Sequence, residues 1–368
     1  MKRIVLSFLL ILVVSQIKAQ PLAQRLDSLL SNDPMLRTSE VGITVFDLTT
    51  GESLFQYQDE KLYRPASTEK VVTSVTALAT LGLDYTMDTR LQYTGKIEND
   101  TLKGNLYLVG GFDPEFMDED LDSLVDVIAQ SGIRYIADTL AADVSMMDSV
   151  YWGNGWSWDD VPDSFQPYMS PLMLNRGCVD VTVIPAEKDS LPIIECVPAS
   201  DYYQVDNDGV SNNPQAGNLR ITRNWLHNGN LIHVSGNVSK KTTRTLSIYT
   251  SKDFFFHTFI NRLKEKGIEV NTTAFADCPE NDSLRVVSPL FTLQRPIGEV
   301  LTQMMKESDN LCAESMFYHL ALHHTQQKRV KDNDGSDAIN HFVKESLGLN
   351  PEYYNIVDGS GVSLYNYI

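Results

Sequence analysis

The sequence predicts an α/β fold whose core is built from both ends of the chain and carries a large β-rich insertion between them. Helical periodicity dominates up to about residue 88 and returns near Pro296. From about Arg90, short strand-like runs with glycine-rich turns replace it. The chain is also too long for one simple core. We therefore expect a discontinuous core over residues 21–88 and 286–368, and one or two satellite domains over 89–285 with a nested irregular insert at about 151–225.

The first 19 residues predict a secretory signal peptide. Met1-Lys2-Arg3 is basic, residues 4–14 are apolar apart from Ser7, and the small Ala19 stands before the expected cleavage point. The apolar run is too short to serve as a permanent membrane span. No cysteine follows it, so a bacterial lipid anchor is not indicated. We expect an exported, periplasmic protein without a transmembrane anchor.

The mature chain begins with a predicted helix, a hairpin and a second helix. Leucines at helical spacing predict a helix over residues 22–31. Residues 41–48 alternate as a strand, a Thr-Thr-Gly turn follows, and residues 53–57 return as its partner. Pro65 then favours an extended approach. A helical segment begins at Ser67 and reaches about Leu81.

The middle of the chain contains two weakly similar helix-glycine-strand units. A helix over residues 120–130 is followed by Gly132-Ile133 and a strand, and a helix over 254–266 is followed by Gly267-Ile268 and a strand. Its run of three phenylalanines, Phe254-Phe255-Phe256, is expected in the core. Beyond Pro296, residues 300–305 and 311–322 predict two more helices.

Composition and charge exclude several classes of protein. The net charge of -18 argues against nucleic acid and anionic membranes as partners. No cysteine pair is spaced as CxxC, so a zinc or redox motif is not expected. An exported location permits disulfides, and a Cys178–Cys196 bridge stays open. The acidic runs at 118–120 and 332–335 do not fit an EF-hand and are expected to be solvated loops. His319, His323 and His324 are expected at the surface.

Ser67-Thr68-Glu69-Lys70 is the first candidate for chemistry. At the start of a helix, residues three apart share a face, so the Ser67 hydroxyl and the Lys70 amine can meet. A serine needs such a base to become a nucleophile, and burial lowers the pKa of a lysine enough to supply one. The pattern is weak alone, because Ser15 and Lys18 match it too. The simpler alternative is that Ser67 only caps a helix.

A Ser-x-Asn motif supplies the second candidate. It occurs three times, but only Ser308-Asp309-Asn310 lies between two predicted helices. The simpler alternative is again a helix-to-helix turn. In combination, the two motifs match two of the three marks of penicillin-interacting serine enzymes. Their chemistry needs a second hydroxyl to relay the proton to the leaving amine, and an amide to hold the substrate's peptide bond.

With these motifs the chain resembles the class C low-molecular-mass penicillin-binding proteins, the D-alanyl-D-alanine carboxypeptidase/endopeptidase family. The 241 residues from Ser67 to Ser308 add weight, because simple serine β-lactamases place these motifs closer together. The stretches that carry the resemblance extend to the end of the chain: Arg64-Pro65-Ala66-Ser67-Thr68-Glu69-Lys70, Leu106-Tyr107-Leu108-Val109-Gly110-Gly111-Phe112-Asp113-Pro114, Trp158-Asp159-Asp160, Met305-Lys306-Glu307-Ser308-Asp309-Asn310-Leu311 and Asp358-Gly359-Ser360-Gly361.

The resemblance implies a penicillin-binding, serine β-lactamase-like core, with an antiparallel sheet, helices and a helical lobe. It implies cleavage of the terminal D-Ala, and often of the D-Ala cross-link, in peptidoglycan stem peptides ending in D-Ala-D-Ala. Ser67 would be acylated, Lys70 would be its base, Ser308 would relay the proton and Asn310 would bind substrate. Beta-lactams would acylate Ser67 as substrate mimics. No metal or organic cofactor is implied.

The third mark of the family, Lys-Thr/Ser-Gly, has no match after Ser308. The nearest sequence, Lys241-Thr242-Thr243, lacks the glycine and lies too early, and the given sequence ends seven residues after Gly361. We therefore expect the C-terminal strands of the core to be missing from this chain. Loss of one oxyanion donor costs about 10²–10³ in rate. The alternative function is therefore a truncated, non-catalytic homologue that binds cell-wall peptide or is inactive. A β-lactamase is less favoured, because it would not need the large insertion.

Overall fold

The computed structural model describes residues 21–280 and 286–368. They form two compact units, which divide between Tyr63 and Arg64. The predicted signal peptide at residues 1–19 lies outside the described residues. Among the helices that are described, none has the length and hydropathy needed to cross a membrane.

The smaller unit contains one helix and one hairpin, as the sequence predicts. Helix α2 spans Leu22–Asn32, and strands β1 (Ile43–Asp47) and β2 (Glu52–Tyr57) pair antiparallel. The Tyr63 hydroxyl closes this unit, since it lies 2.9 Å from the Val41 carbonyl oxygen and 3.0 Å from that of Gln58.

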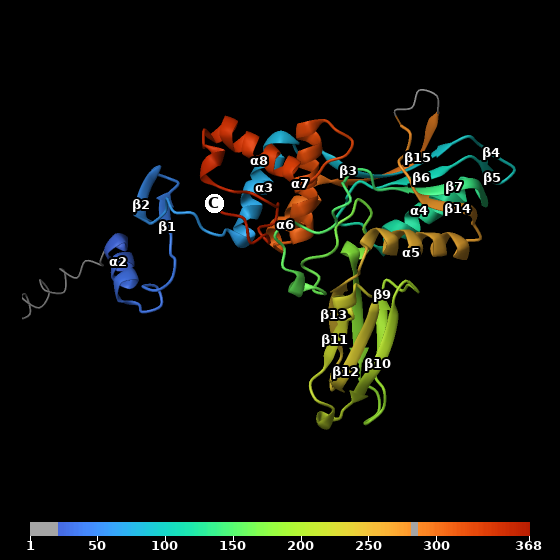
Figure 1. Cartoon of the computed structure of the whole chain (residues 1–368), viewed down its shortest axis with the longest axis horizontal. Coiled ribbons are helices and arrows are strands. Elements are labelled where there is room, and N and C mark those ends of the chain that lie inside the picture. The colour runs from blue at the N-terminus through green and yellow to red at the C-terminus, as the bar shows by residue number, and fades with distance from the viewer. Residues whose placement is uncertain (1–20, 281–285) are drawn as a thin grey trace, which may run out of the picture. The chain divides into compact units, whose positions relative to one another are not determined.

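The larger unit is organised around a seven-stranded mixed sheet, counted over the described residues. Its main path runs β15-β3-β6-β7-β5-β4, with β14 paired to β7 (Figure 1). The pairs β15–β3 and β3–β6 are antiparallel, whereas β6–β7, β5–β7 and β14–β7 are parallel. The strand bounds are Thr86–Thr94 for β3, Lys96–Glu98 for β4, Thr101–Lys103 for β5, Leu106–Val109 for β6, Tyr135–Asp143 for β7, Glu269–Phe275 for β14 and Val287–Pro296 for β15.

The two helix-glycine-strand units predicted from the sequence lie side by side in this sheet. Helix α4 (Asp118–Gln130) leads into β7, helix α5 (Ser251–Glu265) leads into β14, and the two strands pair in parallel. The helices contact each other, and Arg262 on α5 pairs with Asp118 and Asp122 on α4. The two units thus share the same order of elements and lie beside each other in the fold.

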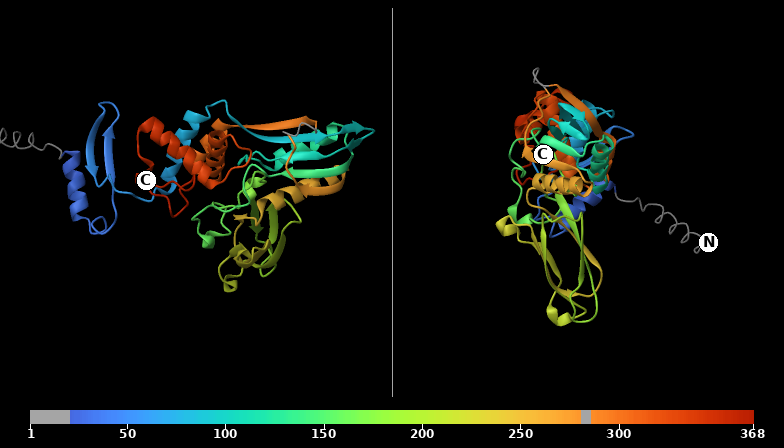
Figure 2. Two further views of the ribbon diagram at one scale, coloured as in Figure 1. Left: turned by 45° about the horizontal axis from the view of Figure 1, so that its top comes forward. Right: turned by 90° about the vertical axis from the view of Figure 1, so that its right-hand side faces the viewer.

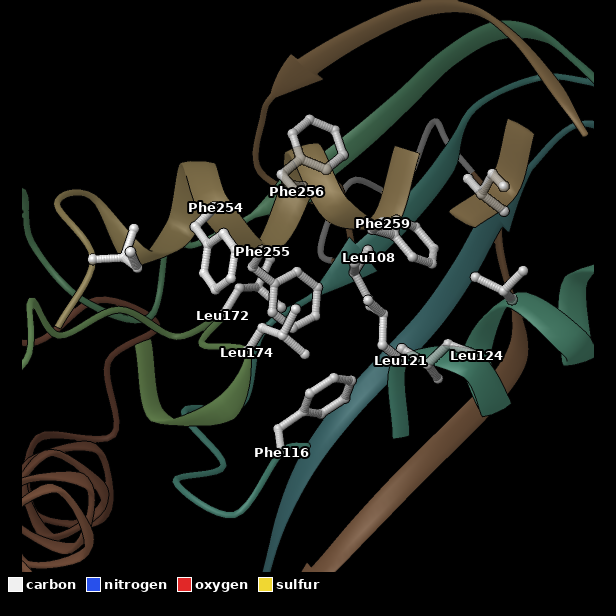
Figure 3. Packing of buried hydrophobic residues seen from close by; sticks show 14 of the residues in the cluster. Leu108, Phe116, Leu121, Leu124, Leu172, Leu174, Phe254, Phe255, Phe256 and Phe259 are labelled. Atoms are coloured by element: carbon white, nitrogen blue, oxygen red, sulfur yellow. The ribbon is translucent and has the colours of Figure 1, made fainter. Parts of the chain in front are cut away.

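The phenylalanine run of α5 is buried, as predicted. Phe255 packs against Phe116 with ring centroids 5.0 Å apart. Figure 3 shows Phe254, Phe255 and Phe259 of α5 facing apolar residues from the sheet, from α4 and from the segment that follows residue 170, whereas Phe256 points to the other side of the helix and packs against Phe275. Transfer of this apolar surface out of water is what holds the helix on the sheet.

The expectation of an irregular insert is wrong for residues 178–223, which form four strands. With two later strands they make two three-stranded sheets, β13-β8-β9 and β10-β12-β11, which project from the large sheet (Figures 1 and 2). A signal was available, because Val179, Val181 and Val183 alternate with polar residues and are buried. The bounds are Cys178–Ile184 for β8, Ile193–Val197 for β9, Gln204–Ser211 for β10, Arg220–Arg223 for β11, Leu231–Val238 for β12 and Thr242–Ser247 for β13.

The pairing of β8 with β9 also decides the cysteine question in this structure. Cys196 stands opposite Val181 rather than opposite Cys178. Both thiols are free, as are those of Cys278 and Cys312.

A cluster of four helices covers the other end of the larger unit (Figure 2). Helix α7 (Asn310–Thr325) is buried along most of its length and packs against α3 (Glu69–Thr80), α6 (Ile297–Lys306) and α8 (Asp332–Leu347). Helices α3, α6 and α7 were predicted from the sequence, with small differences at their ends. Because α3 and α7 are in contact, the segments that precede them are brought together.

Two sequence expectations in this cluster are wrong. Residues 332–335 are not a solvated loop but the first turn of α8, where Asp332 and Asp334 lie at the positive end of the helix dipole. His319 is not at the surface but buried, with Nδ1 2.8 Å from the Tyr85 hydroxyl and Nε2 2.9 Å from the Gly111 carbonyl oxygen. Helix α7 has no exposed face there, which periodicity alone does not reveal.

Candidate active site

Ser67 lies in a 3-10 turn, Ala66–Thr68, that leads directly into α3. The Thr68 hydroxyl donates to the Pro65 carbonyl oxygen at 2.7 Å and fixes this turn. The Ser67 side chain is exposed, whereas Lys70 is buried. Their side chains meet as the spacing predicts, with 3.1 Å between Ser67 Oγ and Lys70 Nζ.

Lys70 has two further partners, and both can only accept. Its Nζ lies 2.7 Å from Asn310 Oδ1 and 2.9 Å from the Ser360 carbonyl oxygen. A neutral amine has two N–H groups and one lone pair. If the N–H groups are donated to these two acceptors, the lone pair remains for the Ser67 hydroxyl. The geometry therefore suits an amine that removes the proton of Ser67.

The surroundings of Lys70 favour its neutral form. Burial lowers the pKa of Lys70, and the nearby carboxyls of Glu314 and Asp358 oppose this only in part. Burial also raises the pKa of Glu69 to about 8 and that of Glu314 to about 8, with Asp358 adding to both. Burial therefore disfavours the charged forms of all three groups, and the lowered pKa makes the Lys70 amine easier to deprotonate.

The loop of residues 358–361 is held by buried polar groups. The Asp358 carboxyl accepts hydrogen bonds from the Gly361 backbone N–H at 2.8 Å and from Trp156 Nε1 at 2.9 Å. Glu314 accepts from the Ser360 backbone N–H at 2.9 Å. These contacts fix the carbonyl oxygen of Ser360 that faces Lys70.

The Ser308-Asp309-Asn310 motif forms the turn between α6 and α7, as expected. Asp309 caps α7, because its Oδ1 accepts the backbone N–H of Cys312 at 2.9 Å. The Asn310 amide faces two ways, with Oδ1 toward Lys70 and Nδ2 donating to the Phe165 carbonyl oxygen at 2.9 Å. Ser67, Lys70 and Asn310 are thus connected. Within the described residues, no hydrogen bond joins the Ser308 hydroxyl to Ser67 or Lys70.

Ser308 and Asn310 instead line a cleft of about 420 Å³, whose lining does not include Ser67 or Lys70; Asn310 connects this cleft to Lys70. The opposite wall belongs to the inserted part of the chain, including Arg176, Asp180 and Thr245. This volume is in the range of small-molecule binding sites. The cleft therefore has room for a small ligand on the Ser308 and Asn310 side of the site.

Several residues of the site were not predicted from the motifs. Glu314 stands one helical turn after Asn310 on α7, a spacing that could have indicated a shared face. Arg176 and the carbonyl of Phe165 come from the segment predicted to be irregular, and nothing in the local sequence points to them.

The comparisons with known proteins agree with this geometry. Residues 22–368 match the model of the D-Ala-D-Ala carboxypeptidase 3 (S13) family. The chain belongs to this family. The chain is similar to two curated relatives. The D-alanyl-D-alanine carboxypeptidase DacB of Haemophilus influenzae is 25% identical over 90% of this chain. The D-alanyl-D-alanine carboxypeptidase of Actinomadura sp. strain R39 is 26% identical over 94% of this chain. The chain spans 68% and 65% of their lengths.

The structure of penicillin binding protein 4 (dacB) from Haemophilus influenzae is similar to this S13 chain. The TM-score is 0.75 at 25% identity, over 89% of this chain and 72% of that one. The predicted fold, a penicillin-binding core with an added β-rich part, is therefore confirmed. The predicted class, a serine D-Ala-D-Ala carboxypeptidase, is confirmed at the level of the family. The domain boundaries and the roles of Ser67, Lys70, Ser308 and Asn310 remain predictions.

Proposed function

We propose that this S13 chain removes the terminal D-Ala from peptidoglycan stem peptides ending in D-Ala-D-Ala, and cleaves the D-Ala cross-link, through an acyl-enzyme on Ser67. We place this activity in the periplasm, on the basis of the predicted signal peptide. The observation that carries the proposal is the position of Lys70, whose two N–H groups have fixed acceptors while Ser67 Oγ lies 3.1 Å away.

In the first step, Lys70 takes the proton of the Ser67 hydroxyl, and Ser67 Oγ attacks the carbonyl carbon of the penultimate D-Ala. The backbone N–H of Ser67, at the start of α3, is a candidate donor to the oxyanion that forms. The C–N bond then breaks, and the leaving D-Ala amine receives a proton by way of Ser308. Water afterwards attacks the acyl-enzyme and releases the shortened peptide.

Asn310 and the adjoining cleft supply the binding part of the proposal. The Asn310 side chain lies between Lys70 and the cleft wall, where its amide can reach the peptide bond of a bound stem peptide. Beta-lactams acylate Ser67 in the same way, because their strained amide takes the place of the D-Ala-D-Ala bond.

The alternative is a non-catalytic homologue that binds cell-wall peptide in the cleft without turnover. Intact-protein mass spectrometry with benzylpenicillin separates the two functions. We expect a covalent adduct on the wild-type chain and on its Ser67 peptide after digestion, and none on Ser67→Ala.

The same samples should be tested for release of D-Ala from a pentapeptide ending in D-Ala-D-Ala. A folded chain that forms no adduct, releases no D-Ala and still binds the pentapeptide would refute the enzymatic proposal in favour of the binding protein. An adduct that persists in Ser67→Ala would show that another residue is the nucleophile.

A further inference from the structure

We propose that Arg176, which belongs to the inserted part of the chain, is a positioning residue that holds Ser308-Asp309-Asn310 in its working geometry. This inference deepens the proposed function and rests on it. It assigns a role in the reaction to the insertion, whose strands lie outside the helical cluster that carries Ser67 and Lys70.

The guanidinium of Arg176 bridges two carboxylates from different parts of the fold. One nitrogen bonds Asp309 in the Ser-Asp-Asn turn, and the other bonds Glu115 in the loop between β6 and α4. The side chains are only 24%, 15% and 22% exposed for Arg176, Asp309 and Glu115, so solvent weakens these pairs less than it would at the surface. Arginine suits such a bridge because its donors lie in a rigid plane.

Arg176 lines the cleft, but its charge is already shared between two carboxylates, which disfavours it as a receptor for a substrate carboxylate. Burial by itself would lower the pKa of Arg176, but Asp309 and Glu115 outweigh it and the pKa is raised. One cation therefore faces two carboxylates, and little positive potential remains for a third anion in the cleft. The contacts that the structure does show for Arg176 are those that hold Asp309 and Glu115.

Asp309 connects the Arg176 ion pair to the Ser308-Asp309-Asn310 turn. Its Oδ2 bonds Arg176 while its Oδ1 caps α7. Ser308, next to it, has a φ of 56°, and Arg176 itself has a φ of 63°. Residues other than glycine adopt this region only where their surroundings enforce it. We infer that the ion pair keeps Ser308 in this backbone conformation and therefore sets the direction of its hydroxyl.

The insertion makes a second contact with the same turn. The Phe165 carbonyl oxygen accepts the Asn310 Nδ2 hydrogen bond at 2.9 Å, eleven residues before Arg176 in the chain. Asp309 and Asn310 are thus both held by one segment of the insertion. A change in this segment should affect the turn without any contact to Ser67.

The test compares Arg176→Met with Arg262→Met. Arg262 is a matched control, because it too bridges two carboxylates, is 20% exposed and joins two elements of the larger unit without lining the cleft. We expect Arg176→Met to slow acylation of Ser67 by benzylpenicillin about 10²-fold, the usual result of a small misplacement in an active site. Arg262→Met should lose stability but acylate at the wild-type rate. Arg176→Lys, which keeps the charge but not the planar fork, should fall in between.

A second readout separates this inference from the proposed function. Hydrogen exchange of the first-turn amides of α7 should become faster in Arg176→Met and stay unchanged in Arg262→Met, whether or not the chain is an enzyme. A double-mutant cycle combines Arg176→Met with Asp309→Asn. The double variant should be acylated no more slowly than the slower of the two single variants, because both changes break the same ion pair. Equal effects of Arg176→Met and Arg262→Met on both readouts, or additive effects in the cycle, would overturn the inference. A wild-type chain that is never acylated refutes the proposed function, and the exchange measurement then decides on Arg176 alone.

Discussion

Replacing Glu69 by glutamine should change how the stability of the larger unit depends on pH. The Glu69 side chain is buried, and neither carboxyl oxygen has a hydrogen-bond partner among the described residues. Burial first, and Asp358 second, raise its pKa from 4.5 to about 8. The folded state therefore holds a proton that the unfolded chain releases, so this contribution is complete below pH 4.5 and is lost as the pH rises through 8.

The size of the effect follows from these two pKa values. Each tenfold change in proton concentration is worth about 1.4 kcal/mol per group, so Glu69 alone accounts for about 3–4 kcal/mol of unfolding free energy lost between pH 5 and pH 8. Glu69→Gln cannot ionise and should lose that much less over the same range. Urea unfolding at several pH values, followed by circular dichroism, measures the difference.

A matched control is Glu345→Gln, which removes an exposed carboxylate on α8. Its stability should fall in parallel with that of the wild-type chain. The reasoning is refuted if Glu69→Gln also runs parallel to wild type between pH 5 and pH 8, because Glu69 would then be ionised in the folded protein.

Three further outcomes can be checked with the same materials. Lys70→Met should slow the acylation of Ser67 by about 10²–10⁴, the usual contribution of a general base, and the growth of the penicillin adduct in mass spectra measures this rate. In the wild-type chain the acylation rate should rise with pH until Lys70 has lost its proton. Because the pKa of Lys70 is lowered, this should occur below its usual value of 10.5. Trp156→Phe removes a buried hydrogen bond to Asp358 and should lower the free energy of unfolding by about 1–3 kcal/mol in urea titrations, while a parallel loss of acylation would show that the loop of residues 358–361 loosens. Phe255→Ala leaves a cavity under α5 and should cost about 3–5 kcal/mol in the same titration without changing the acylation rate of the folded fraction.

Most of the fold and the nucleophile could be predicted from local patterns. The helices α2, α3, α6 and α7 follow from apolar residues at helical spacing, and the first hairpin follows from alternation around a glycine turn. The Ser67–Lys70 contact follows from three-residue spacing at a helix start, because neighbours on one helical face must meet wherever that helix lies. These features depend on residues close together in the chain.

The structure of the insertion was harder to predict from the sequence, because its strands are short and pair with strands far away along the chain. Strand β10 lies parallel to β12, and β13 pairs with β8 across more than fifty residues of chain. Such pairing is decided by which surfaces are buried together, so the alternating valines of β8 could have indicated a strand but not its partners. The buried position of His319 has the same origin, since α7 is covered on all sides by elements from other parts of the chain.

The sequence by itself determined the family motifs, the pairing of Ser67 with Lys70 and the placement of Ser308-Asp309-Asn310 between two helices. Only the tertiary structure decided what surrounds them: the two oxygen acceptors that face Lys70, the buried carboxyls beside it whose pKa is raised, and the arginine that pairs with Asp309. The reason is physical. Local spacing fixes which side chains share a helical face, whereas burial and hydrogen-bond partners come from segments up to 290 residues away in the chain.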